Sequence, residues 1–166
     1  IPAFGRIVGR MQYDLFHAYT VDAHTLFVLR NLRRMALSRF DHEFPRHSLI
    51  FQQLPKPELA FLAALFHDIG KGFPNKDHSE YGEELIRPLA KRLGFDAKDS
   101  EVIALLVREH LLLSAVATRR DLEDPATIAF VVEKIKDPEA LQLLHALSIS
   151  DGEATGKSAW SDWKAG

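Results

Sequence analysis

The longest unbroken apolar stretch of the chain, Leu59–Phe66, is followed directly by two potential metal ligands, His67 and Asp68. Eight consecutive apolar residues predict a helix that is buried on all sides, because a surface helix would show only one apolar face. Pro57 suits the first turn of this helix, and Gly70 suits a left-handed residue that would close it. The chain therefore carries an imidazole and a carboxylate into its centre, where an unpaired charge is costly and a bound cation would remove that cost.

Apolar residues recur with helical periodicity in the rest of the chain. Only the short run Ile128–Val132 resembles a strand, and it is flanked on both sides by residues typical of helices. Asp77 and Glu80 have the spacing of a capping box, which places His78 in the first turn of a helix that Gly94 would close. Residues 1–19 are expected to form a loop or a short helix, and residues 41–48 a polar connection. Helices are expected from Thr20 or Asp22 to about Phe40, over Leu49–Leu54, from Leu59 to the His67-Asp68 pair, from His78 to about Leu93, from Asp96 to His110 or Leu113, over Ala126–Lys136, and from Pro138 to Asp151. The pattern predicts an all-α bundle of about six or seven helices.

Composition limits the chemistry that such a bundle can perform. The 166 residues, 46% hydrophobic and 27% charged, are typical of a single soluble globular domain. The absence of cysteine excludes disulfides, zinc-thiolate sites and cysteine nucleophiles, and it agrees with a cytoplasmic setting. A formal net charge of −2 gives no general attraction to nucleic acid or to an anionic membrane, and no apolar run is long enough to span a bilayer. Because the chain begins at Ile1 and ends in a loose tail, Ser158–Gly166, we expect residues 1–166 to be one domain of a longer protein.

Potential metal ligands stand near the ends of five of the predicted helical segments. A single histidine is more often structural than ligating, but residues from separate helices can converge inside a bundle. The carboxylate of Asp68 can also bridge two ions with its two oxygens. The candidates are His24, His67, Asp68, His78, His110 and Asp151.

The order of these residues resembles the HD superfamily of metal-dependent phosphohydrolases. His78 and His110 resemble the version of the pattern whose members hold two metals. Ala23 and Glu109 depart from it, since an acidic residue and a second histidine often stand at these places. Four further blocks make nearly the whole chain similar to the HD domain of bacterial PII uridylyltransferase/uridylyl-removing enzymes: Gln12–Thr25, Leu54–Leu59, His110–Ser114 and Arg119–Pro125.

This resemblance implies hydrolysis of the phosphodiester that links UMP to a tyrosine of the PII nitrogen-signalling protein. Uridylylated PII would be the partner, and UMP and unmodified PII the products. Members of the family also have a nucleotidyltransferase domain and glutamine-sensing ACT domains. Neither is present in these residues, so transferase activity and control by glutamine are not assigned to them.

The types of ligand fit hydrolysis that depends on divalent ions. One ion would suffice, but the HD pattern with His78 and His110 favours two. We expect one ion to be held by His24, His67, Asp68 and Asp151. A second ion would share Asp68 and add His78 and His110 (the one-metal HD enzymes do without these two histidines). Imidazole and carboxylate ligands without thiolate suit Mn, Fe, Zn or Co, and Mg remains an option. Bound ions would neutralise phosphate oxygens and lower the pKa of a coordinated water.

Four cationic residues are candidates for contacts with the substrate. Lys71 follows Asp68 in a glycine-flanked turn and could stabilise charge on phosphoryl oxygens or on a leaving tyrosinate. Arg10, Arg119 and Arg120 are candidates for phosphate or partner contacts, because the guanidinium fork matches phosphate geometry. The alternative for Lys71 and for the Arg119-Arg120 pair is that they are ordinary solvated surface residues without a role in function.

Two other functions remain open from the sequence. The first is an HD hydrolase of a small nucleotide, such as a guanosine polyphosphate or a dinucleotide. The second is a regulatory module whose pocket transmits a signal without catalysis. Retention of all six candidate ligands and of Lys71 argues against the second alternative, because a purely structural domain has no need for such a set.

Overall fold

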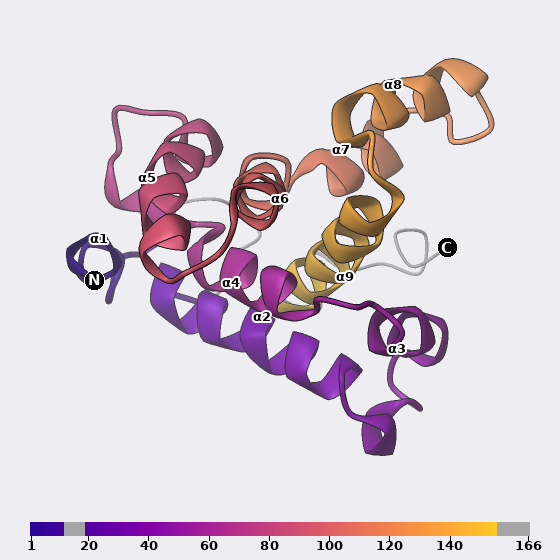
Figure 1. The fold of residues 1–166 in the computed structure, drawn as a ribbon, viewed down its shortest axis with the longest axis horizontal. Coiled ribbons are helices and arrows are strands. Elements are labelled where there is room, and N and C mark those ends of the chain that lie inside the picture. Colours follow the sequence, from indigo (N-terminus) through magenta and orange to yellow (C-terminus); the bar gives the residue numbers. More distant parts are fainter. Residues whose placement is uncertain (12–18, 156–166) are drawn as a thin grey trace.

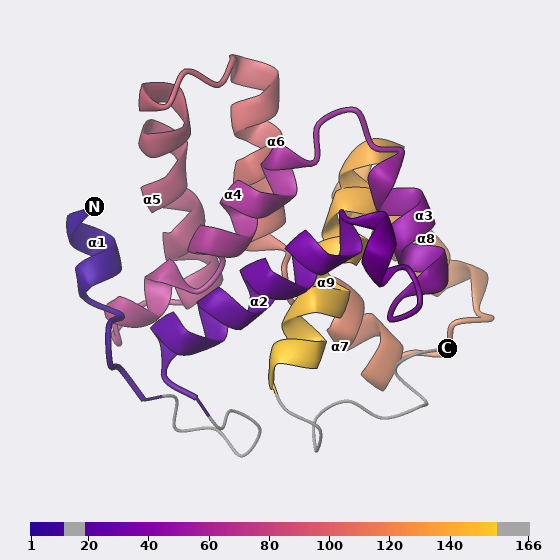
Figure 2. The ribbon, with the colours of Figure 1, turned by 90° about the horizontal axis from the view of Figure 1, so that it is seen from below.

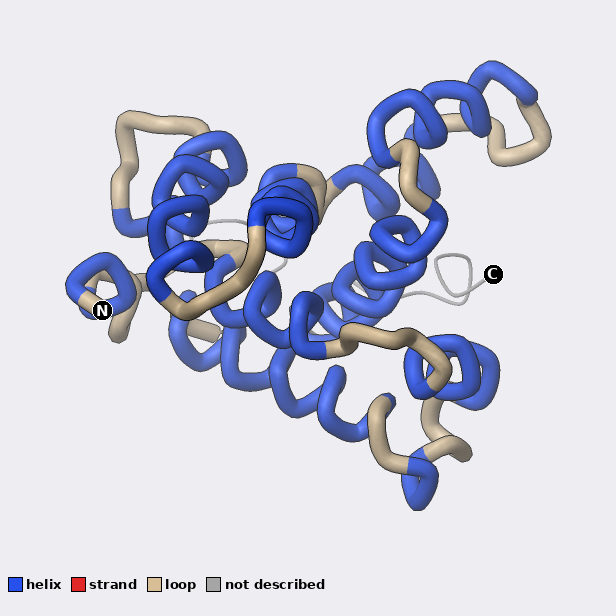
Figure 3. The backbone as a smooth tube through the Cα atoms, in the orientation of Figure 1, coloured by secondary structure: helices blue, strands red, loops and turns tan. Residues whose placement is uncertain are grey.

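The computed structural model describes residues 1–11 and 19–155, and these residues form an all-α structure (Figures 1 and 3). Within them, the extended structure is limited to an isolated bridge between Met11 and Thr20. The elements are α1 (Pro2–Gly5), α2 (Val21–Met35), η1 (Ser38–Phe40), α3 (Pro45–Gln52), α4 (Glu58–Phe66), η2 (Ile69–Gly72), α5 (His78–Arg92), α6 (Ala97–Arg108), α7 (Leu112–Arg119), α8 (Pro125–Ile135) and α9 (Pro138–Thr155), where η marks a 3₁₀ helix. The predicted all-α bundle is confirmed.

Helix α4 is the centre of the arrangement, packed among α2, α6 and α9 (Figures 1 and 2). No residue from Leu59 to Gly70 is exposed, so the helix that the apolar stretch predicts is buried on all sides. Helix α5 packs along α6 on one side of this core, while α9 packs along α2 on the other. The end of α4 therefore lies deep in the molecule, with helix ends around it.

Several predicted boundaries differ from the structure. Helix α2 ends at Met35 instead of Phe40, and α3 begins at Pro45, inside the predicted connection, because proline suits a first helical position. Helix α6 ends at Arg108, so the apolar run after it belongs to α7, a helix that the sequence patterns did not reveal. With the four-residue α1, this brings the count within the described residues to nine α-helices.

The predicted ends of α5 are confirmed, whereas the role predicted for Gly70 is wrong. The side chain of Asp77 accepts hydrogen bonds from the backbone N–H groups of Ser79 and Glu80 at 2.9 and 3.0 Å. Gly94 has the left-handed backbone that ends this helix, with a φ of +90°. Gly70 instead lies inside η2, because the chain passes from α4 directly into this tighter turn. The tail at 158–166 and the block at 12–18 lie outside the described residues.

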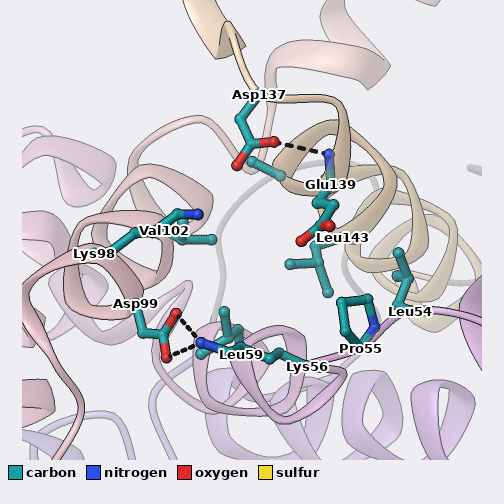
Figure 4. Close-up of a pocket in the computed structure, with 11 residues that line it drawn as sticks. Leu54, Pro55, Lys56, Leu59, Lys98, Asp99, Val102, Asp137, Glu139 and Leu143 are labelled. Carbon is teal, nitrogen blue, oxygen red and sulfur yellow. Dashed lines mark hydrogen bonds and ion pairs between the residues drawn. The ribbon is translucent and has the colours of Figure 1, made fainter.

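A small cavity of about 70 Å³ lies where α4, α6 and α9 meet (Figure 4). The ammonium group of Lys56 donates to both carboxylate oxygens of Asp99, at 2.9 and 2.7 Å, and so fastens the chain before α4 to α6. A volume of this size suits about two water molecules. None of the six candidate ligands lines the cavity, which is therefore a packing junction. Among the described residues, no helix combines the length and apolarity needed to cross a membrane.

Candidate metal centre

The six candidate ligands converge on one region at the end of α4 and form two groups of three. Within each group, the potential ligand atoms lie within 4.8 Å of one another. Four of the six side chains are almost completely buried, although all six are polar. The first group is His24, His67 and Asp151, and the second is Asp68, His78 and His110.

Asp68 belongs to the second group but also faces the first, because its two carboxylate oxygens point to different histidine pairs. Its Oδ2 is 3.4 Å from Nε2 of His67 and 3.9 Å from Nε2 of His24. Its Oδ1 is 3.6 Å from Nε2 of His110 and 3.7 Å from Nε2 of His78. Because consecutive residues in a regular helix diverge by about 100°, His67 and Asp68 could not both point here from within α4. They stand at its end instead, where the chain turns into η2.

Helix α9 completes the first group with Asp151. Its Oδ1 lies 2.7 Å from Nε2 of His24 and 3.6 Å from Nε2 of His67. The helix continues to Thr155, one turn beyond its predicted end, and this turn brings the carbonyl oxygen of Ala154 to 3.4 Å from Nδ1 of His24. A carbonyl near a helix end lacks its usual helical partner and is available for such a contact.

Backbone carbonyls also orient the two other buried imidazoles. Nδ1 of His67 is 2.7 Å from the carbonyl oxygen of Ala64, and Nδ1 of His110 is 2.7 Å from that of Val107. Since a carbonyl oxygen can only accept, each Nδ1 is the protonated nitrogen. In the neutral ring, the lone pair is then on Nε2, which faces the centre and suits metal binding. These main-chain partners were not predicted from the sequence, although each lies three residues before its histidine.

The two carboxylates of the centre stay ionised and so favour a positive charge beside them. Burial opposes ionisation of Asp68, but His67, Lys71 and His110 outweigh it and keep the pKa of this carboxyl below its usual value. Desolvation likewise opposes ionisation of Asp151, but its hydrogen bond with His24 and the nearby His67 keep the pKa of this carboxyl well below its usual value. Burial disfavours a charged His67, yet the two carboxylates raise its pKa to about 9. Burial and the nearby His67 lower the pKa of His110 to about 4, so this ring stays neutral.

Three buried atoms of the centre have no hydrogen-bond partner: Nε2 of His67, Oδ1 of Asp68 and Nε2 of His78. Within the described residues only three other buried side-chain atoms share this condition. An unsatisfied buried polar group costs about 1–3 kcal/mol. Divalent ions would satisfy all three atoms, and nitrogen and carboxylate oxygen are the ligands that first-row divalent metals accept. The residues present therefore fit two ions.

Lys71 also lies at the centre, where its ammonium group donates to Oδ2 of Asp68 at 2.9 Å. With 22% of its side chain exposed, Lys71 is more accessible than the buried ligands, as is His78 at 26%. These two residues therefore mark a side of the centre that solvent reaches.

The three candidate arginines lie in different surroundings. Arg10 is partly buried, and its carbonyl oxygen accepts from the backbone N–H of Val21 at the start of α2. Arg119 is exposed at the end of α7, while the guanidinium of Arg120 stacks over the ring of Phe130, 4.1 Å from its centroid. Their contacts with a substrate stay a prediction.

Glu109 stands where a histidine often precedes His110. It is largely buried, and its carboxylate faces two cationic side chains. Its carboxylate lies 3.2 Å from Nε of Arg108 and 3.8 Å from Nζ of Lys134. The residue thus links the end of α6 to α8 and is outside both ligand groups.

A larger hollow of about 470 Å³ lies between α7, α8 and α9 and is almost entirely apolar. Its walls include Val116, Ile128 and Val132, and His145 is its one imidazole. No candidate ligand lines it, so the chemistry of the chain is concentrated at the end of α4.

Comparison with known proteins agrees with this geometry. The HD domain family matches residues 21–146. The chain belongs to the HD domain family. HD domains bind divalent metals, and the two groups described above could hold them. Asp151 lies beyond the matched residues, but α9 brings it to His24.

Three bacterial relatives are each named "Bifunctional uridylyltransferase/uridylyl-removing enzyme" and are 47% identical to this chain over 99% of its length. They come from Methylococcus capsulatus, Acinetobacter baumannii and Nitrosococcus oceani. The chain spans only 19%, 18% and 18% of their respective lengths. The resemblance predicted from the sequence is thus confirmed for the region that the chain covers.

Proposed function

We propose that this chain is a metal-dependent phosphodiesterase that releases UMP from a uridylylated tyrosine of the PII signalling protein. The observation that carries the proposal is the position of Asp68, whose two oxygens face two separate histidine groups. The names of the similar proteins, which include uridylyl removal, support the choice of substrate. The resemblance described in the sequence analysis favours PII as the partner, and the absence of cysteine agrees with the cytoplasm as the location.

Each ligand has a defined part in this proposal. His24, His67 and Asp151 would hold one ion, His78 and His110 the other, and Asp68 would bridge them. When bound, such ions lower the pKa of a coordinated water from about 15.7 towards about 7 and neutralise phosphate oxygens. Manganese, iron, zinc and cobalt suit these ligands, and magnesium is the weaker alternative.

The proposed reaction is hydrolysis of the phosphodiester bond to tyrosine. The oxygen of water attacks phosphorus, the bond between phosphorus and the tyrosyl oxygen breaks, and this oxygen takes up a proton. The ammonium group of Lys71, held at Asp68, would stabilise negative charge on the phosphoryl or tyrosyl oxygen as it develops. Arg10, Arg119 and Arg120 are proposed to contact the phosphate or the PII surface.

The test is incubation of the chain with uridylylated PII and with each divalent metal, followed by chromatographic measurement of UMP. Guanosine polyphosphates and dinucleotides serve as competing substrates, and Asp68→Ala is the inactive control. We expect release of UMP from PII and no hydrolysis of the free nucleotides. Hydrolysis of a small nucleotide alone would establish the other enzymatic function, and no hydrolysis with any metal would leave a regulatory module.

A further inference from the structure

The second ligand group is built where the backbone of α5 comes unusually close to its neighbours. A Cβ atom placed on Gly70 would lie 2.0 Å from the carbonyl oxygen of His78 and 2.7 Å from both the carbonyl carbon and the Cα of that residue. Real Cβ atoms essentially never lie within 3.0 Å of such atoms. Because the obstacle is backbone, it cannot rotate away as a side chain would. Only glycine permits this approach.

The approach at Gly70 determines how far His78 lies from Asp68. Asp68 stands two residues before Gly70, and its Oδ1 is 3.7 Å from Nε2 of His78. A methyl group at position 70 would force the start of α5 to move by about 1 Å to reach the shortest tolerated distance. Metal–ligand distances tolerate deviations of only about 0.2 Å. The displacement of His78 would therefore be too large for an ion to stay bound by all members of the second group.

A second close approach lies one turn further along α5. A Cβ atom on Gly82 would be 3.0 Å from Cγ1 of Val107, on α6. The carbonyl oxygen of Val107 accepts from Nδ1 of His110 at 2.7 Å. Residues four apart lie on the same face of a helix, so Gly82 and His78 face α6 together. The spacing at Gly82 thus influences the separation of His78 and His110, whose ring centroids are 5.3 Å apart.

The first ligand group depends on different elements. His24 lies on α2, His67 at the end of α4 and Asp151 on α9. The three nearest contacts of a Cβ on Gly70 are all with His78 of the second group, and a Cβ on Gly82 would be 3.8 Å from the carbonyl oxygen of His67, an ordinary contact distance. The two groups can therefore be disturbed separately.

We propose that Gly70 and Gly82 are positioning residues that create the second ion site. An added methyl group at Gly70 converts a two-ion centre into a one-ion centre, and one at Gly82 weakens the second ion only. The inference rests on the two-ion site of the proposed function, but it concerns how ions bind and not which substrate is cleaved.

The first experiment compares wild type with Gly70→Ala and with Gly5→Ala. Gly5 is a matched control, because a Cβ there meets no heavy atom within 4 Å. Manganese or zinc bound per chain is counted by mass spectrometry after equilibrium dialysis, and affinities are measured by calorimetry. We expect two ions for wild type and Gly5→Ala. Gly70→Ala should keep one ion, with the affinity for the second at least about tenfold lower.

The second experiment keeps the inference testable if Gly70→Ala folds poorly by circular dichroism. Gly82→Ala should weaken the second ion by at least about threefold, because the stiff Val107 side chain must give way. Adding Val107→Ala removes the obstructing Cγ1 and should restore the affinity to that of Val107→Ala alone. A second ion bound with wild-type affinity in a folded Gly70→Ala or in Gly82→Ala, or a wild type that binds fewer than two ions, would overturn the inference. A wild type that binds two ions but releases no UMP would refute only the proposed function.

Discussion

The ammonium group of Lys71 lies 2.9 Å from Oδ2 of Asp68, the carboxylate oxygen that also faces His67 at 3.4 Å. A cation of the protein thus occupies part of the space around an oxygen that would bind a divalent ion. The ammonium group and an ion bound at this oxygen would repel each other, so we expect Lys71 to lower the affinity of the first group for metal. The same charge is well placed to interact with a phosphate, which is negative.

Replacing Lys71 should therefore separate metal binding from catalysis. In Lys71→Met we expect kcat for UMP release to fall by about 100-fold, since a donor that stabilises developing charge is lost. The affinity for metal should be unchanged or higher. Lys98→Met, on the exposed surface of α6, is the matched control and should change neither quantity. A variant of Lys71 that binds metal more weakly but keeps its kcat would contradict this role.

Removing the charge of Asp68 should affect both ion groups at once. Asp68→Asn keeps the shape of the side chain but loses the anion whose oxygens face the two groups. We expect each ion to bind at least about tenfold more weakly and UMP release to fall by about 1,000-fold, with helix content unchanged. Asp151→Asn is the informative comparison, because its Oδ1 faces only His24 and His67. If Asp151→Asn weakened both ions equally, the bridging role of Asp68 would be wrong.

The sequence anticipates the convergence of the candidate ligands because they stand near helix ends that local signals mark. The apolar run before His67 indicates burial, and the capping residue Asp77 places His78 at the start of its helix. The adjacency of His67 and Asp68 also requires a helix end, which the structure shows. These signals are all local, and so a single sequence reveals them.

Features that arise from contacts between distant segments are harder to predict from the sequence. Gly70 suits a left-handed helix end when only its neighbours in sequence are considered, but the structure requires glycine there because of the backbone of His78. Likewise, the run at Leu111–Leu113 reads as a continuation of α6, although the helix breaks before it, where His110 turns its ring to the carbonyl of Val107. The packing of helices decides both cases.

The cap at the start of α5 supports a further prediction about His78. In Asp77→Ala, the backbone N–H groups of Ser79 and Glu80 lose their acceptor, and the free energy of unfolding should fall by about 1 kcal/mol. We also expect weaker binding of the second ion, because His78 is the first residue of this helix. Urea unfolding and calorimetric metal titration measure the two effects.

Asp96→Ala is the control, since Asp96 caps α6 in the same way by accepting from the backbone N–H of Asp99 at 2.7 Å. It should cost about as much stability while leaving the affinity for the second ion unchanged. Equal loss of ion affinity in Asp77→Ala and Asp96→Ala would show that reduced stability alone is responsible.

A pair of histidines outside the centre should make stability depend on pH. The rings of His47, on α3, and His145, on α9, meet edge to face with centroids 4.8 Å apart. Burial lowers the pKa of both side chains, helped at His47 by Arg46 and at His145 by His47. In the unfolded chain, both rings return to the ordinary histidine value of 6.5.

The direction of the effect follows from proton binding. Above about pH 7 both states hold neutral rings, and the pair has no influence on the pH dependence. As the pH falls through 6.5, the unfolded chain takes up protons that the folded chain does not, so the free energy of unfolding decreases. This decrease continues until the lowered pKa values of the folded state are passed.

His145→Gln should therefore reduce the loss of stability between about pH 7.5 and about pH 5.5, because one of the two rings no longer titrates. Urea unfolding at both pH values, with a chelator present to keep metal linkage out of the comparison, gives the difference for wild type and variant. The variant can be less stable at either pH, since the ring also packs. An unchanged or larger pH-dependent loss in His145→Gln would show that the pair does not titrate as its burial between α3 and α9 requires.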